Sequence, residues 1–274
     1  MPMARKRILL TGASSGIGRA CCELLAADGD EVVGLDIQAA PPQAAQHVQC
    51  DLSEPDSIDA ALRQIDGRFD ALLNVAGVPG TVDPALIMRV NILGLKHLTE
   101  AVIDRLNPGG AIVSVASIAG FNWQRRLAQL TQFLAQPDFA AGLRWFEQHP
   151  LDANGAYHFS KEAVVVYTMQ LAGPARSRGL RCNSVSPGPV DTPLLPAFKI
   201  QAGAGQLDWV IEQTGGASTP MDIAHVLRFL ATGPSDCING RDLAVDRGLT
   251  AGLVTGWIDK NDSPLLNSRK TQAP

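Results

Sequence analysis

The 274-residue sequence has no excess of positive charge, and this absence excludes whole classes of partner. Its 23 lysines and arginines are outnumbered by 27 aspartates and glutamates, so the formal net charge is −4 and the isoelectric point is near 5.7. Proteins that bind nucleic acid or an anionic membrane carry a basic surface that attracts phosphate. We therefore expect neither nucleic acid nor a membrane as a partner.

Long hydrophobic runs are also missing. The basic start of the chain looks like the beginning of a signal peptide, but the apolar run that follows extends only from Ile8 to Leu10. A secretory signal needs about 7 apolar residues in a row, and a membrane-spanning helix needs about 20. The sequence thus predicts neither secretion nor membrane insertion, and we expect a cytoplasmic protein.

The cysteines and histidines lack the spacing of disulfide frameworks, metal sites or catalytic triads. His47 and His158 have no spaced partner for such a role. The cysteines are odd in number and scattered, which indicates reduced structural thiols, and no metal is expected. They are Cys21, Cys22, Cys50, Cys182 and Cys237.

Short apolar segments alternate with amphipathic ones along the chain. Strands that are apolar throughout are typical of a sheet buried on both faces, and helical patterns between them imply right-handed crossovers and parallel pairing. We predict one α/β domain over residues 1–274, a Rossmann-type doubly wound parallel sheet with helices on both faces. The expected strands are 7–11, 31–36, 70–75, 111–117, 180–185 and 242–246.

Residues from about 121 to 153 interrupt this alternation with two helical stretches where one connection would be enough. Six of the 14 aromatic residues fall between positions 121 and 146, so we predict an inserted helical hairpin. Its aromatic rings either stack on a flat substrate or bury the hairpin against its own domain or a partner subunit. The helical faces are Leu127, Leu130 and Leu134, then Phe139, Leu143 and Phe146, with Pro137 and Pro150 at the ends.

A glycine-rich turn, Thr11-Gly-Ala-Ser-Ser-Gly-Ile-Gly18, follows the first expected strand and opens the first helix. Glycines allow a tight turn and a close approach of the backbone, while free N–H groups and the helix dipole attract phosphate. The turn predicts a site for a dinucleotide pyrophosphate. Its expected contacts are Gly12, Ser14, Ser15, Gly16, Ile17 and Gly18.

Asp36 ends the second expected strand, 18 residues after Gly18. A carboxylate at this place accepts hydrogen bonds from the adenine ribose hydroxyls and repels a 2′-phosphate. The flanking Ser15 and Ile37 offer no cation to that phosphate, and Arg19 faces either this site or solvent. The sequence therefore predicts NAD rather than NADP.

Tyr157 and Lys161 are four residues apart and share one face of a helix. A nearby cation favours the phenolate, so we expect Lys161 to lower the pKa of Tyr157 from its usual value near 10. The spacing alone also fits a half-exposed helix face. Ser117 strengthens the interpretation as an acid/base pair, because it ends an expected strand where open α/β sheets place their sites.

These motifs, together with Asn91 and Pro187-Gly-Pro-Val-Asp-Thr-Pro193, resemble those of the short-chain dehydrogenase/reductase family from Arg7 to about Leu249. The resemblance implies an oxidoreductase that uses NAD and interconverts an alcohol and a carbonyl on a small molecule. Ser117 would hold the substrate oxygen, Tyr157 would take the alcohol proton, and Lys161 would position cofactor and phenol. Asn91 would hold a proton-relaying water, or else kinks or caps its helix.

The resemblance assigns further cofactor contacts, and it implies a homodimer or homotetramer. Tyr157 and Lys161 also belong to the cofactor set. Asp51 is one of these cofactor contacts, but it has a second interpretation, because an aspartate equally suits the N-terminus of a helix. The other contacts are Asp51, Leu52, Asn74, Ala76, Gly77, Pro187, Gly188, Val190 and Thr192.

Ser117 and Tyr157 are 40 positions apart, whereas most members of the family have a much shorter interval. The hairpin and a shortened front half resemble the subgroup of 3α-hydroxysteroid dehydrogenase/carbonyl reductase and coniferyl-alcohol dehydrogenase, and the runs 74–81 and 91–102 resemble the latter more closely. We expect a bulky apolar substrate, a coniferyl-type aryl allylic alcohol, with a hydroxysteroid as the alternative. The hairpin and Leu194, Leu195, Phe198 and Trp209 should flank the site.

Three points stay open. A non-enzymatic dinucleotide sensor has the same fold, although such proteins usually lack the tyrosine or the lysine, and a sugar-nucleotide epimerase usually has another glycine spacing. Arg247 stands where relatives commonly have glycine, and it reaches either the cofactor edge or a neighbouring subunit. The tail, about residues 253–274, has no motif and is expected to be a loose or partner-draped end.

Overall fold

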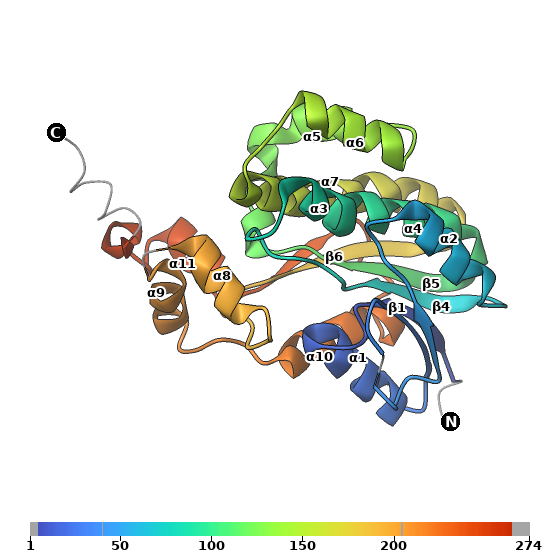
Figure 1. Cartoon of the computed structure of the whole chain (residues 1–274). Coiled ribbons are helices and arrows are strands. Elements are labelled where there is room, and N and C mark those ends of the chain that lie inside the picture. The colour runs from blue at the N-terminus through green and yellow to red at the C-terminus, as the bar shows by residue number, and fades with distance from the viewer. Residues whose placement is uncertain (1–4, 40, 204, 265–274) are drawn as a thin grey trace.

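A computed structural model describes residues 5–39, 41–203 and 205–264 (Figure 1). Seven parallel strands form one sheet in the order β3-β2-β1-β4-β5-β6-β7, which confirms the predicted doubly wound architecture. The first part of the expected tail, up to residue 264, is packed rather than loose, because Ile258 and Ser263 are buried there, and the tail lies outside the described residues from position 265 onward. The strands are β1 (Arg7–Thr11), β2 (Glu31–Asp36), β3 (Gln46–Gln49), β4 (Phe69–Asn74), β5 (Leu106–Val115), β6 (Arg181–Pro187) and β7 (Asp242–Val245).

The strand bounds follow from how much of each strand is buried. The central strands are apolar because they are covered on both faces; Ile8, Leu9 and Leu10 of β1, for example, are inaccessible to solvent. The sequence provides no bounds for β3, because only Val48 of this edge strand is buried. β5 begins five residues earlier than expected, through a segment with Pro108 and two glycines whose pairing with β4 is irregular.

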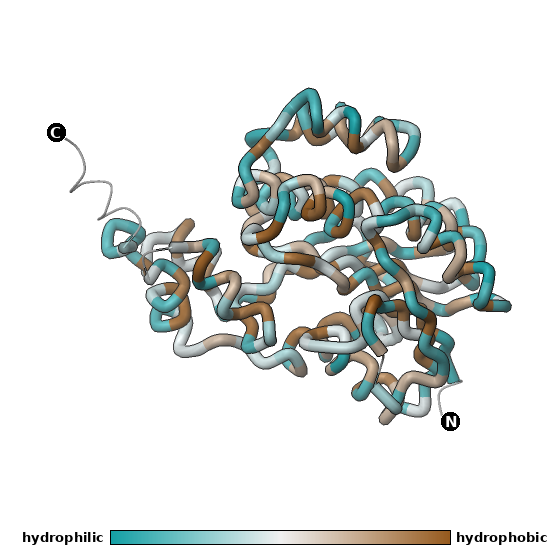
Figure 2. Tube along the Cα trace, in the orientation of Figure 1, coloured by the Kyte–Doolittle hydropathy of each residue, from teal (hydrophilic) through white to brown (hydrophobic). Residues whose placement is uncertain are grey.

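Helices cover both faces of the sheet (Figure 1). One face packs against α1 (Gly16–Ala27) and α10 (Pro220–Thr232), and the other against α2 (Pro55–Arg63), α4 (Leu95–Val102) and α7 (Ala153–Ser177). In Figure 2 the hydrophobic segments gather inside these layers, and hydrophilic segments follow the outer turns. The short helix α3 (Pro84–Met88) runs through a π-helical turn (Arg89–Gly94) into α4.

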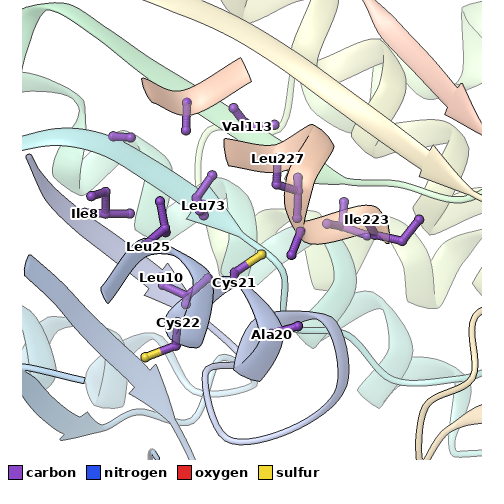
Figure 3. Packing of buried hydrophobic residues seen from close by; sticks show 14 of the residues in the cluster. Ile8, Leu10, Ala20, Cys21, Cys22, Leu25, Leu73, Val113, Ile223 and Leu227 are labelled. Atoms are coloured by element: carbon purple, nitrogen blue, oxygen red, sulfur yellow. The ribbon is translucent and has the colours of Figure 1, made fainter. Parts of the chain in front are cut away.

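The cysteines support the interpretation as structural thiols at four of five positions. Figure 3 shows Cys21 and Cys22 on α1, beside side chains of the sheet and of α10 such as Leu73 and Leu227. Burial raises the pKa of Cys22 to about 11, which keeps its thiol protonated and unreactive at neutral pH. Cys50 and Cys182 are also buried, whereas Cys237 is exposed.

The predicted hairpin is formed by α5 (Leu127–Leu134) and α6 (Phe139–Gln148), preceded by a short 3₁₀ turn (Trp123–Arg126). It lies on the outer side of α7 and α3 as an additional layer (Figure 1). Leu130 and Leu134 are buried as expected, but Leu127 is 44% exposed, because it is the first residue of α5 and projects beyond the contact. Asp138 starts α6 by accepting a hydrogen bond from the N–H of Ala141.

A smaller lobe lies beyond the carboxyl ends of β6 and β7 (Figure 1). It contains α8 (Leu195–Ala202), α9 (Gln206–Gln213) and α11 (Leu249–Thr255). Val210, Leu249 and Ile258 form its small core, and Ile118 after β5 packs against it. The lobe thus leans on the edge of the sheet where parallel α/β proteins bind ligands. Within the described ranges, no helix is both long and apolar enough to cross a membrane.

Candidate active site

A cavity of about 1020 Å³ lies along the carboxyl edge of the sheet, between the sheet and the small lobe. Small-molecule sites usually measure about 300–1,000 Å³, so this one is large enough for a dinucleotide together with a substrate. Most residues predicted for the site line it. They are Gly12, Ser15, Gly16, Ile17, Gly18, Asp36, Asp51, Leu52, Ala76, Gly77, Ser117, Tyr157, Lys161, Pro187, Gly188, Val190 and Thr192.

The glycines of the first turn form a cradle that side chains would fill. Gly12 has φ of +73°, and a Cβ there would lie 2.9 Å from the Cα of Ala76. A Cβ on Gly18 would lie 2.0 Å from the carbonyl oxygen of Gly12. Backbone therefore approaches backbone at the start of α1, as a bound pyrophosphate requires. The residues present fit the phosphates of a dinucleotide.

Asp36 supports the same turn from the end of β2. Its carboxylate accepts hydrogen bonds from the N–H groups of Ser14 and Gln38, each at 3.0 Å. Ser14 itself lies behind the wall of the cavity, and its hydroxyl donates to the carbonyl of Gln38. Asp36 thus faces the cavity from a fixed position at the point where an adenine ribose would lie.

The cations near this end are turned elsewhere. Arg19 is exposed and pairs with Glu23 along the surface of α1 at 2.9 Å. Its guanidinium is therefore directed to solvent, which is the second of the two orientations that the sequence left open. Among the described residues that line the cavity, no arginine occurs and Lys161 is the one lysine. The adenosine end of the cavity therefore offers a carboxylate and no fixed positive charge.

Asp51 and Asn74 have structural partners of their own. Asp51 lines the cavity and accepts hydrogen bonds from the N–H and the hydroxyl of Ser53 at 2.8 and 2.7 Å. Its alternative role at the N-terminus of a helix is wrong, because the N-cap of α2 is Glu54 and no side chain caps that helix. Asn74 is buried between β4 and β5, where its amide donates to Thr99 and Ser114. The structure describes Asn74 but places it outside the cavity lining, because its side chain points into the sheet.

Tyr157, Ser117 and Lys161 converge at the centre of the cavity. The phenol of Tyr157 hydrogen-bonds the hydroxyl of Ser117, and the ammonium of Lys161 lies 5.9 Å from the centroid of the tyrosine ring. Lys161 donates to the carbonyl of Val115 at the end of β5, at 3.0 Å. Both α7 side chains are 6% exposed, so a helix face brings two polar groups into an almost water-free place.

The expected lowering of the pKa of Tyr157 is wrong for this arrangement. Burial raises the pKa of Tyr157 to about 12, although the hydrogen bond from Ser117 acts in the opposite direction. Burial lowers the pKa of Lys161 to about 8. The reason is that removal from water penalises the charged form of both groups, and this outweighs the attraction that spacing alone suggested. At neutral pH the phenol keeps its proton.

Asn91 lies outside the cavity lining, within the π-helical turn of the described chain. Its Oδ1 accepts from the N–H of Val78 at 2.8 Å, and its Nδ2 donates to the carbonyl of Val78 at 3.0 Å and to Ser160 at 3.3 Å. The hydroxyl of Ser160 in turn donates to the carbonyl of Tyr157. The side chain of Asn91 therefore ties the loop after β4 to α7.

The aromatic side chains of the hairpin do not face the site. None of residues 121–153, all of which the structure describes, lines the cavity. The ring of Phe133 instead lies 5.4 Å from Phe159 and 5.3 Å from Trp145, on the outer side of α7. The hairpin thus uses its rings to pack against its own domain, the second of the roles considered, because Phe159 points away from Tyr157 on the same helix.

The small lobe supplies the apolar end of the cavity. Leu194, Leu195 and Phe198 line it as expected, but Trp209, which the structure also describes, packs into the core of the lobe. Sequence patterns gave no signal for several other wall residues, because all but one come from short helices without a motif, and Asn154 lies in the first turn of α7 before the motif begins. These are Asn154, Gln201, Leu207, Val210, Leu249 and Leu253.

Arg247 does not reach the edge of the cavity in the described structure, and its contact with a neighbouring subunit stays a prediction. Its guanidinium donates to the carbonyl of Thr214 at 3.2 Å, and it does not line the cavity. It is the one described non-glycine residue with positive φ, +54°. This left-handed conformation explains why a glycine suits the position. In the described ranges no cluster of three or more His, Cys, Asp and Glu side chains is placed to hold a metal ion.

Comparison with protein families places two matches along the chain. A family described as short chain dehydrogenase matches residues 6–129, and one described as enoyl-(acyl carrier protein) reductase matches residues 146–250. The interval between the two matches, residues 130–145, falls within the hairpin.

Individual proteins resemble the chain over most of its length. Coniferyl-alcohol dehydrogenase of Pseudomonas sp. (strain HR199 / DSM 7063) is 37% identical over 93% of this chain and 100% of that protein. The 3-alpha-hydroxysteroid dehydrogenase/carbonyl reductase of Comamonas testosteroni is 28% identical, over 89% of this chain and 96% of that protein. The crystal structure of 3-alpha-hydroxysteroid dehydrogenase from Pseudomonas sp. B-0831, complexed with NADH, is 32% identical over 92% of this chain and 99% of that chain, with a TM-score of 0.76.

Proposed function

The chain belongs to the short-chain dehydrogenase/reductase family, and we propose that it is an NAD-dependent oxidoreductase that transfers hydride between the nicotinamide and an alcohol or carbonyl substrate. The observation that carries the proposal is the meeting of Tyr157, Ser117 and Lys161 in a cavity whose other end is the glycine cradle. Hydride chemistry belongs to the cofactor, so the protein has to position it and move a proton.

The residues around the catalytic tyrosine divide this work. A bound nicotinamide supplies the hydride chemistry and, when oxidised, a positive charge. Ser117 holds the reacting oxygen, and Lys161 holds the nicotinamide ribose beside the phenol. Tyr157, with a pKa of about 12, keeps its proton at neutral pH and donates it during carbonyl reduction. Alcohol oxidation requires the phenolate, which nearby positive charge stabilises.

The proton path involving Asn91 also stays a proposal. The hydrogen-bond partners of its side-chain amide are Val78 and Ser160, so we place the relaying water at the backbone of the π-helical turn rather than at this amide. Such turns are frequent at functional sites. The homodimer or homotetramer and the cytoplasmic location remain predictions as well.

The preference for NAD over NADP is supported by Asp36 and by the missing cation at the adenosine end. A 2′-phosphate placed there would meet a carboxylate without a compensating arginine. We expect kcat/KM to be about 100-fold higher with NAD than with NADP, and Asp36→Ala to reduce that ratio at least about 10-fold. A wild-type preference for NADP contradicts the proposal.

The proposed substrate is a coniferyl-type aryl allylic alcohol, with a hydroxysteroid as the second candidate. Support comes from the apolar wall of Leu194, Leu195, Phe198 and Leu207 and from the two relatives whose names specify these substrates. The test is a panel of aryl allylic, benzylic and steroid alcohols, followed by NADH absorbance. The highest kcat/KM should fall on the aryl allylic alcohols; turnover of none of the panel overturns the substrate assignment.

A further inference from the structure

The helix α8 covers the cavity next to Tyr157 but is poorly anchored. Along its length, all of which the structure describes, no side chain is buried. The ring of Phe198 reaches inward to a centroid distance of 5.6 Å from the ring of Tyr157. An exposed pair between Lys199 and Asp208 joins α8 to α9, at 2.6 Å, and exposed pairs hold elements together weakly. Other contacts must keep Phe198 in place.

Gln201, one turn after Phe198, makes the strongest of these contacts. Its Nε2 donates to Oδ1 of Asn154 at 3.1 Å, and its Oε1 accepts from the N–H of Gly80 at 2.7 Å. Asn154 lies one turn before Tyr157 on α7, and Gly80 lies in the loop after β4. One amide therefore connects the three segments that surround the entrance. We call these three residues the amide clasp.

Gly80 is shaped for this contact. It is buried, and a Cβ added to it would lie 2.7, 2.8 and 3.0 Å from Cδ, Nε2 and Oε1 of Gln201. Any side chain at position 80 would thus push the amide of Gln201 out of its place. The two hydrogen bonds of the amide and the space that Gly80 leaves for it describe one closed arrangement.

We propose that Gln201 is a specificity-determining residue, because the amide clasp holds Phe198 over Tyr157 and so limits the size of the alcohol. This rests on the proposed function. Gln201 and Asn154 line the cavity together with Phe198 and Tyr157, so the clasp forms part of its wall. A single aromatic ring with a short side chain fits inside the closed wall. A fused polycyclic alcohol has to displace α8, which breaks the clasp.

The test compares variants that open the clasp from opposite sides. Gln201→Met keeps the length of the side chain but cannot make either hydrogen bond, and Gly80→Ala displaces the amide without altering α8. Gln201→Glu still accepts from Gly80, and the amide of Asn154 can rotate to donate to it. Gln213→Met, at the exposed end of α9, is the matched control.

With both opening variants we expect KM for an aryl allylic alcohol to rise about 10-fold. We also expect a rise of about 10-fold in the ratio of kcat/KM for a hydroxysteroid to kcat/KM for an aryl allylic alcohol, which is within the range that pocket contacts supply. Gln201→Glu should stay close to wild type, and so should Gln213→Met. Unchanged ratios in both opening variants, or an equal change in Gln213→Met, overturn the proposal.

Amide hydrogen exchange of residues 195–202 tests the clasp without any substrate. We expect exchange about 10-fold faster in Gln201→Met and Gly80→Ala than in wild type, because open states of a weakly anchored helix become more populated. Exchange that does not change in both variants overturns the clasp. If the wild type turns over none of the alcohols while exchange responds as expected, the proposed function fails and the clasp stands.

Discussion

The two tyrosines of the chain lie on the same helix, ten residues apart, and both are 6% exposed. Tyr157 faces the cavity and hydrogen-bonds Ser117, with Lys161 beside its ring. Tyr167 packs into the interior, where its hydroxyl has no hydrogen-bond partner among the described residues. Burial raises the pKa of both. The comparison teaches that two equally buried tyrosines can differ in their neighbours, and we propose a role in proton transfer only for Tyr157, which has a hydroxyl and an ammonium beside it.

The charged residues of α7 show the same division. Lys161 and Glu162 are adjacent, and both are buried. Lys161 points to the cavity and donates to the carbonyl of Val115, whereas Glu162 points to the hairpin, 3.6 Å from Arg126. One face of the helix therefore lines the cavity, where we propose the reaction takes place, and the other holds the hairpin. Substitutions on the two faces should separate activity from stability.

The largest effect is expected from Tyr157→Phe, which removes the hydroxyl that exchanges the proton. Turnover should fall about 10³-fold, in the range for loss of a general acid or base, while NAD binding and thermal stability stay close to wild type. Steady-state kinetics with NAD fluorescence titration measures both. Tyr167→Phe is the matched control and should keep its turnover. Equal losses in the two variants, or unchanged turnover of Tyr157→Phe, would contradict the comparison.

On the outer side, Phe133→Ala should lower the free energy of unfolding by about 3–5 kcal/mol, because it removes a ring that is 2% exposed and packed against Phe159 and Trp145. Urea unfolding measures this. Phe133→Leu, which leaves a smaller cavity, should lose clearly less. At a temperature where the variant is folded, kcat should remain within about 3-fold of wild type. A loss of kcat as large as that of Tyr157→Phe would show that the two faces are not independent.

A smaller change in stability than that of Phe133→Ala, and one of opposite sign, is expected from Lys161→Met. Burial lowers the pKa of Lys161 from 10.5 to about 8, so below pH 8 the folded chain bears the full cost of the buried charge. This cost disappears as the pH rises from 8 to 10.5. Because the lost hydrogen bond to Val115 offsets part of this gain, the variant should be about 2 kcal/mol more stable than wild type at pH 7 and about 1 kcal/mol less stable at pH 10.5, where only that loss remains. Turnover should be lost, as at other sites that trade stability for function.

Glu162→Gln is the counterpart on the outer side. Burial raises the pKa of Glu162, and positive charge from Arg126 and His158 acts against this. The wild-type chain therefore loses stability as the pH rises through that pKa, and the variant should gain less than about 1 kcal/mol at pH 7 and nothing below pH 4. The two gains vanish at opposite ends of the pH scale. Urea unfolding at several pH values would refute this if both gains had the same pH dependence.

Much of this molecule follows from local sequence. Strands that are apolar throughout predict a buried parallel sheet, and five of the seven strands begin within one residue of their expected start. The exceptions have physical reasons: β3 is an edge strand with one buried side chain, and β5 begins in a segment with proline and glycine. The glycine turn and the pair of Tyr157 and Lys161 could be predicted because the spacing of these residues along the chain follows from the geometry of a turn and of a helix.

The sequence alone determined the sheet, the place of the cradle and the types of residue at the centre of the cavity, since these depend on neighbours close along the chain. Only the tertiary structure decided the direction of the pKa of Tyr157, the side of α7 that the hairpin covers and the clasp formed by Gln201, Asn154 and Gly80. Desolvation and long-range contacts depend on which segments meet in space. Residues 80, 154 and 201 carry no mutual spacing from which their meeting could be read.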